Sequence, residues 1–244
     1  MKVGVRGSKL ALAYAQKAIE AIGVGEIVII KTDGDLHPDT PIHEIGGKGV
    51  FCNAIEYALA QGLIDVAVHS LKDMPGDVEH PDLQVCAVLE RSSPYDVVLG
   101  NVFDGFVLGT SSPRRTAQLE QLYANLNVVI KPIRGNIDTR LAKLDSGEYD
   151  AIVLAEAGLN ALGIDREYTR LDIVPAVGQG VIALQTRKND TQTNSIVSKA
   201  NHKLTYDQAH LERALLKGIQ GDCQTKVAAY ATGSNPIQLK AVFY

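Results

Sequence analysis

Short β-branched runs alternate with amphipathic segments of helical length along almost the whole chain. This alternation predicts an α/β fold with largely parallel sheets, because a crossover helix is the usual connection between two parallel strands. We expect strands at residues 3–5, 26–30, 65–68, 83–89, 128–130, 151–154 and 181–185. Helices are expected at 9–22, 50–61, 113–123, 137–144 and 204–216, where apolar residues recur every three or four positions.

Two turn-rich stretches, residues 90–94 (ERSSP) and 175–180 (PAVGQG), predict two crossings between two lobes. Two crossings leave a cleft, where α/β proteins bind ligands at the carboxyl ends of strands. From about residue 202 onward we expect a small third unit with one helix and two strands.

The bulk properties narrow the function. A net charge of -4 and a pI near 5.9 argue against a nucleic-acid partner. The sequence has neither the run of roughly 20 apolar residues that a membrane span needs nor the apolar stretch of a signal peptide. We therefore expect a cytoplasmic protein without a membrane partner.

The three cysteines have neither an even number nor metal-ligand spacing, so a disulfide framework and a zinc site are not indicated. Cys52 and Cys86 lie in apolar segments, whereas Cys223 lies in the polar sequence GIQGDCQTK. Cys223 is therefore the candidate nucleophile or attachment point.

Several cations follow predicted strands. The segment GTSSPRR (109–115) predicts an anion site. Backbone N–H groups lie at the start of a predicted helix, and the guanidinium groups of Arg114 and Arg115 each offer paired N–H donors. The alternative is a helix cap with solvated arginines. Further polar groups of this kind are Arg6, Ser8, Arg134, Arg140 and, in IGGKGVF, Lys48. Such a cluster in an acidic chain predicts a ligand with several negative charges, with scattered surface residues as the alternative.

The segment DVAVHSLKDMP (65–75) ends an apolar strand in His69, Lys72 and Asp73. A carboxylate at a cleft rim can transfer a proton or stabilise a developing cation, so Asp73 is the acid/base candidate. Turn capping is the alternative for this residue.

The ordered set of motifs resembles the porphobilinogen deaminase (hydroxymethylbilane synthase) family from about Val3 to Tyr244. The motifs are RGSKLAL, IGGKGVF, VAVHSLKDMP, GTSSPRR, RGNIDTRLAKLDSGEYDAIVLAEAGL, PAVGQG and GDCQ. The resemblance implies an α/β protein with two lobes of the type II periplasmic binding-protein fold, plus a small, truncated α/β cofactor domain. Lobe one is expected at 1–91 and 178–200, lobe two at 92–177, and the cofactor domain at 201–244.

The resemblance also implies residue roles. Asp73 takes the catalytic position with Lys72 beside it, and Cys223 carries a covalent dipyrromethane cofactor. The groups assigned to the carboxylates of cofactor and substrate are Arg6, Ser8, Lys48, Ser112, Arg114, Arg115, Arg134 and Arg140. Asp35, in TDGD, takes another position of the family's cofactor region. The implied reaction joins four molecules of the substrate porphobilinogen into hydroxymethylbilane, in haem biosynthesis, and a monomer is expected.

The sequence departs from the family pattern at Ala161 (usually arginine), Glu44 (lysine), Tyr14 (glutamine) and in GDCQTK. Fewer cations predict weaker carboxylate binding, and the end at Tyr244 predicts a shortened last domain. Two other functions stay open: a non-catalytic or product-altered binding module for polycarboxylate pyrroles, and a phosphotransferase. The second lacks a recognisable carboxylate pair for magnesium.

Overall fold

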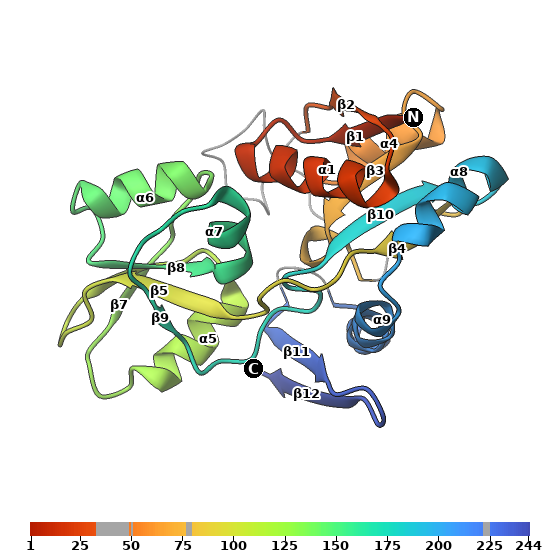
Figure 1. Ribbon diagram of the computed structural model, residues 1–244. Coiled ribbons are helices and arrows are strands. Elements are labelled where there is room, and N and C mark those ends of the chain that lie inside the picture. Colours follow the sequence, from red (N-terminus) through yellow and green to blue (C-terminus); the bar gives the residue numbers. More distant parts are fainter. Residues whose placement is uncertain (33–48, 50, 77–79, 222–224) are drawn as a thin grey trace.

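The computed structural model describes residues 1–32, 49, 51–76, 80–221 and 225–244 (Figure 1). Three predicted functional residues, Asp35, Lys48 and Cys223, lie outside the described residues, and so does Glu44.

The first lobe is a five-stranded sheet between helices. Its strands lie in the order β2 (Glu26–Ile29), β1 (Lys2–Val5), β3 (Val66–Ser70), β10 (Ile182–Arg187) and β4 (Leu83–Val88). β1 runs parallel to β2 and β3, whereas β10 is antiparallel to β3 and β4. Helix α1 (Lys9–Ile22) packs Ala15 and Ala18 on one face, and α4 (Asn53–Ala60) packs Leu59 on the other. Burial on both faces explains the nearly continuous apolar run in β3.

The second lobe repeats this plan. Its strands lie in the order β7 (Val129–Lys131), β6 (Val107–Gly109), β8 (Ala151–Ala155), β5 (Asp96–Gly100) and β9 (Thr169–Arg170). β6 is parallel to β7 and β8, whereas β5 is antiparallel to β8 and β9. Helix α5 (Pro113–Leu122) covers one face through Leu119. Helices α6 (Ile137–Asp145) and α7 (Glu156–Leu162) cover the other through Leu141 and Leu159.

The chain crosses between the lobes twice, from β4 to β5 and from β9 to β10 (Figure 1). Both predicted turn-rich stretches lie in these crossings. The crossings touch at Gly180, where φ is +78° and an added Cβ would lie 2.5 Å from the Ser93 carbonyl oxygen, so glycine is required. The predicted two-lobed α/β fold is confirmed, and the exact domain boundaries stay a prediction.

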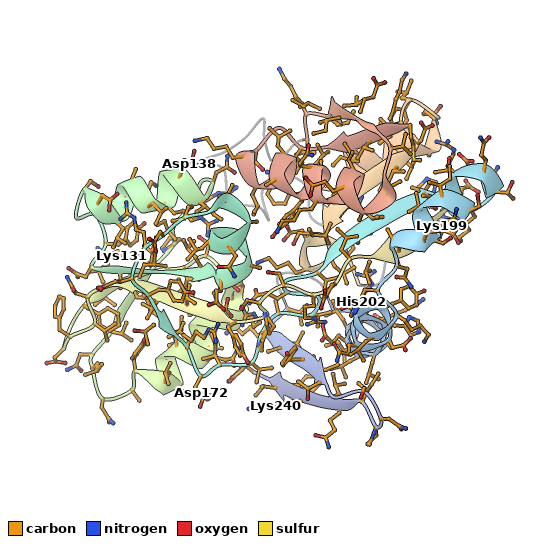
Figure 2. The ribbon with its side chains drawn as sticks, in the orientation of Figure 1. Lys131, Asp138, Asp172, Lys199, His202 and Lys240 are labelled. Atoms are coloured by element: carbon orange, nitrogen blue, oxygen red, sulfur yellow. The ribbon has the colours of Figure 1, made fainter. Side chains whose placement is uncertain are left out.

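The third unit packs α9 (Lys203–Gly218) against a hairpin of β11 (Val227–Thr232) and β12 (Gln238–Phe243). A short helix, α8 (Thr191–Val197), and a 3-10 turn at Ser198–Ala200 lead into it from the first lobe. His202, labelled in Figure 2, precedes α9, and its Nδ1 accepts a hydrogen bond from the Thr205 backbone at 3.4 Å.

Candidate active site

A cleft of about 560 Å³ lies between the lobes, within the size range of small-molecule sites. Both lobes line it, and the third unit contributes Leu216, Thr225 and Val227. Among the described lining residues, eight are cationic and two are carboxylates: Arg6, Lys9, Lys72, Arg114, Arg115, Arg134, Arg140 and Lys143, against Asp73 and Asp138. The cleft is therefore positive in a protein whose net charge is -4.

Lys72 and Asp73 reach the cleft from a 3-10 turn, Leu71–Asp73, at the end of β3. Leu71 is buried, and its backbone N–H bonds the Val181 carbonyl at 2.9 Å, which fixes the turn beneath the cleft. The ammonium of Lys72 donates to Gln179 Oε1 at 3.3 Å. Burial and the charge of Arg115 lower the pKa of Lys72 to about 8, against the opposing charge of Asp73.

Arg114 and Arg115 are built into the wall of the cleft and are buried, so the solvated-cap alternative is wrong for them. Asp96 at the start of β5 accepts from Arg114 Nη2 at 2.7 Å and from Arg115 Nη2 at 2.6 Å. Arg114 and Arg115 also donate to the carbonyls of Val174 and Val153. Burial opposes ionisation of Asp96, but the two guanidinium charges outweigh it and hold the Asp96 pKa far below its usual range. Both arginines line the cleft and stay predicted carboxylate ligands.

The side-chain amide of Gln179 links residues of the two lobes. Its Nε2 donates to the Pro94 carbonyl at 2.7 Å and to Asp96 Oδ1 at 3.0 Å, so its Oε1 is left to accept from Lys72. The amide thus connects Lys72 of the first lobe to the Asp96–arginine cluster of the second. Sequence reasoning missed Gln179 and Asp96, whose only local signals were a glutamine between two glycines and an aspartate directly before an apolar run.

The predicted serines are both helix caps that also line the cleft. Ser8 Oγ accepts from Ala11 N at 3.3 Å, and Ser112 Oγ accepts from Arg115 N at 3.4 Å. A capping role alone accounts for both serines, so their ligand contacts stay a prediction.

The remaining predicted arginines also lie at the cleft. Arg6 follows β1 and places its guanidinium over the Phe51 ring, 4.1 Å from the centroid. Arg134 and Arg140 line the cleft from the second lobe, and Arg140 Nε donates to the Gly135 carbonyl at 2.8 Å. Burial, together with the charges of Arg115 and Arg134, lowers the pKa of Arg140 to about 10, against the opposing charge of Asp73.

The lobes also meet at the mouth of the cleft. Lys9 of α1 forms an ion pair at 3.2 Å with Asp138 of α6, and Figure 2 labels Asp138. Both side chains are more than half exposed, so the pair adds little stability. Helix α7 approaches both elements at Gly158, where an added Cβ would lie 2.7 Å from Ile137 and 3.8 Å from Leu10.

Comparison with known proteins identifies the family. The family model described as porphobilinogen deaminase, dipyrromethane cofactor binding domain, matches residues 1–195. A probable porphobilinogen deaminase of Hyperthermus butylicus is 43% identical over 249 residues, covering 95% of this chain and 81% of that protein. The porphobilinogen deaminase of Orientia tsutsugamushi is 41% identical over 260 residues, covering 98% and 86%. This chain belongs to the porphobilinogen deaminase family.

Membership makes the chain an enzyme of tetrapyrrole biosynthesis with porphobilinogen as substrate and dipyrromethane as cofactor.

Among solved structures, immunogenic lipoprotein A of Vibrio vulnificus is similar with a TM-score of 0.49 and 13% identity, covering 87% of this chain and 99% of that one. Within the described residues, no helix is long and apolar enough to cross a membrane, and no cluster of three potential metal ligands occurs.

Proposed function

We propose that this porphobilinogen deaminase joins four porphobilinogen molecules into hydroxymethylbilane on a dipyrromethane primer linked to Cys223, in haem biosynthesis. The observation that carries the proposal is the single cleft that unites Asp73 and Lys72 with cations from both lobes. We further propose a cytoplasmic monomer whose lobes are residues 1–91 with 178–200 and 92–177, followed by a cofactor-attachment unit from 201.

The charges of the cleft fit the cofactor, since each pyrrole of a dipyrromethane brings two carboxylates. Arg6, Arg114, Arg115, Arg134 and Arg140 would hold these carboxylates, together with Ser8, Ser112 and Lys48, and we propose that Asp35 belongs to the cofactor region without binding its carboxylates. Thr225, two residues after Cys223, lines the cleft, which supports attachment there. When bound, the cofactor supplies the pyrrole carbon to which porphobilinogen is joined.

The chain's own residues would then bind the substrate and move the proton. Lys72, with a pKa near 8, is mostly protonated at pH 7 and can donate to a substrate carboxylate. Asp73 would stabilise the azafulvene cation that porphobilinogen becomes when its amine leaves, and would take the proton released on coupling. Displacement of water when the substrate binds would strengthen both interactions, because the local dielectric constant would fall.

A binding module that captures polycarboxylate pyrroles without joining them is the second candidate. One observation favours this candidate: Arg114 and Arg115 already use several of their N–H donors to bind Asp96. Pure binding needs neither an acid at residue 73 nor a thiol at residue 223, so these two positions discriminate.

The first prediction concerns the primer. Intact-protein mass spectrometry after reconstitution with porphobilinogen should show an adduct of dipyrromethane size, and peptide mapping should place it on Cys223. Cys223→Ser should carry none, because a serine hydroxyl is far less nucleophilic than a thiolate. An adduct on Cys52 or Cys86, or no adduct at all, would contradict the assignment.

The second prediction concerns Asp73. Asp73→Asn, supplied with preassembled cofactor, should keep its fold and primer but add porphobilinogen about 100- to 10,000-fold more slowly, because asparagine is nearly isosteric but exchanges no proton. Asp73→Glu should keep part of the rate. The stepwise mass increase of the enzyme in a single turnover measures this, and near wild-type elongation by Asp73→Asn would reduce Asp73 to a turn residue.

A further inference from the structure

The backbone around Gln179 is fixed on both sides. Gln179 is 1% exposed, and Gly178 and Gly180 flank it. Gly178 has φ +70°, and an added Cβ there would lie 2.9 Å from Leu71 Cγ, in the 3-10 turn that carries the acid/base candidate. On the other side, the Ser92 backbone N–H of the first crossing donates to the Gly180 carbonyl at 2.9 Å. Gln179 is therefore held in place relative to that turn and to the crossing.

The hydrogen bonds of the Gln179 amide determine which way it faces. The Pro94 carbonyl can only accept, and so can the ionised Asp96 carboxylate. The amide nitrogen must therefore face these two groups, and it uses both of its hydrogens on them, at 2.7 and 3.0 Å. The amide oxygen then faces Lys72, so the acceptor of the ammonium is a neutral carbonyl with a fixed direction.

Two carboxylates compete with this carbonyl for the Lys72 ammonium. The negative charges of Asp73 and Asp96 both act on Lys72. Among the described residues, Lys72 nevertheless donates to Gln179 and forms no ion pair with either carboxylate. Asp96 already accepts from two guanidinium groups and from the Gln179 amide. The charge of Lys72 thus stays available, and an ammonium has two further N–H groups for a ligand.

We propose that Gln179 is a positioning residue for the reaction, which holds the Lys72 ammonium at the cleft through a neutral hydrogen bond. The inference rests on the proposed function, in which Lys72 binds a carboxylate of porphobilinogen. A carbonyl orients the ammonium without cancelling its charge. An ion pair with Asp73 would instead occupy both the cation that binds the substrate and the carboxylate that acts on it. Gln179 thus keeps these two groups separate although they are neighbours in the sequence.

The separate effects on KM and kcat test the proposal. Gln179→Met keeps the length of the side chain but has no amide, so Lys72 loses its acceptor. The KM for porphobilinogen should rise about 10-fold, the effect of one hydrogen bond to a charged group, because Lys72 binds the same carboxylate before and during the chemical step. The kcat should change less than about threefold, since Asp73 is left in place. A lower kcat with an unchanged KM would overturn the proposal.

A double-mutant cycle shows whether Gln179 acts through Lys72. In a Lys72→Met background, Gln179→Met should lower kcat/KM by less than about twofold, because the group that it positions is already gone. The control is Gln118→Met, which removes another buried amide, one that bonds the backbone N–H and carbonyl of Val174. Its effect should be the same in both backgrounds. Equal effects of Gln179→Met in both backgrounds would mean that Gln179 only supports the fold.

Gln179→Met also removes the donor to the Pro94 carbonyl, so the thermal midpoint should fall, and the rates are measured well below it. If this variant does not fold, Gln179→Asn, whose amide is on a shorter side chain, must show the same rise in KM and the same cycle. A wild type that does not elongate its primer would overturn the proposed function itself. Normal elongation with independent effects of the two substitutions would overturn the role of Gln179 alone.

Discussion

At the scale of single residues, the site depends on one buried carboxylate. Asp96 has no exposed surface, yet it stays ionised because Arg114 and Arg115 surround it and Gln179 donates to it. The cost of burying this charge is offset only while all its partners are present. Asp96 thereby orients two cations that line the cleft without reaching the ligand itself.

Asp96→Asn should therefore lower the free energy of unfolding by about 3–5 kcal/mol, because it leaves two buried guanidinium groups without their counter-charge. For a chain of this size the thermal midpoint should fall by roughly 10 °C. Asp172→Asn, at an exposed aspartate labelled in Figure 2, makes the same chemical change and should alter the midpoint little.

The depressed pKa of Asp96 also predicts how the stability difference between the wild type and Asp96→Asn changes with pH. The folded-state pKa of Asp96 is depressed, so its contribution is complete above the unfolded value of about 3.9 and is lost as the pH falls toward the folded pKa. The stability gap between wild type and Asp96→Asn should stay constant from pH 7 to pH 5 and narrow below about pH 4. A gap that widens in acid would show that Asp96 is not the ionised centre of the cluster.

At the scale of elements, the sequence predicted those whose ends carry local signals. Helix α1 runs over Lys9–Ile22 as predicted, because Ser8 caps its start and Gly23, at φ +82°, ends it. Helix α5 begins at Pro113 directly after its cap, Ser112.

The elements that were missed have their causes elsewhere in the chain. Helix α7 begins with Glu156, a buried acid that bonds Tyr168 and Arg170 of a later segment. Strand β5 begins with Asp96. The charge of this residue argues against a buried strand in the sequence, because the arginines that pair with it lie elsewhere in the chain. Local propensity does not depend on partners that are distant in the sequence, so it cannot predict these two elements. Strand β9 is only two residues long, which is too short to show a periodic pattern.

The same limit applies to the site. Motifs predicted which cations face the cleft, because each follows a strand end. The link from Gln179 to Asp96 spans 83 residues, and no local pattern contains both. The sequence therefore identified the groups that line the cleft better than the groups that hold them in position.

At the scale of the whole molecule, the third unit fastens both crossings between the lobes. Glu212 of α9 is fully buried and accepts from Arg91 Nη2 of the first crossing, Gly178 N of the second and Ala231 N of β11, each at 2.8 Å. Burial raises the pKa of Glu212, opposed by the charge of Arg91. One side chain outside the lobes thus links both crossings to the third unit.

Glu212→Gln should loosen this attachment, because one of the two glutamine atoms that replace the carboxylate oxygens is an amide nitrogen and would face a donor. We expect a loss of about 3 kcal/mol in the free energy of unfolding. Hydrogen exchange should quicken first in the crossings at 89–95 and 171–181 and in the β11–β12 hairpin, before the lobe sheets, since these are the segments of the described chain that donate to Glu212. Glu120→Gln, at an exposed residue of α5, removes the same charge and should leave all three segments protected. Exchange that quickens equally in the lobe sheets would mean that Glu212 stabilises the fold as a whole and does not hold the crossings in particular.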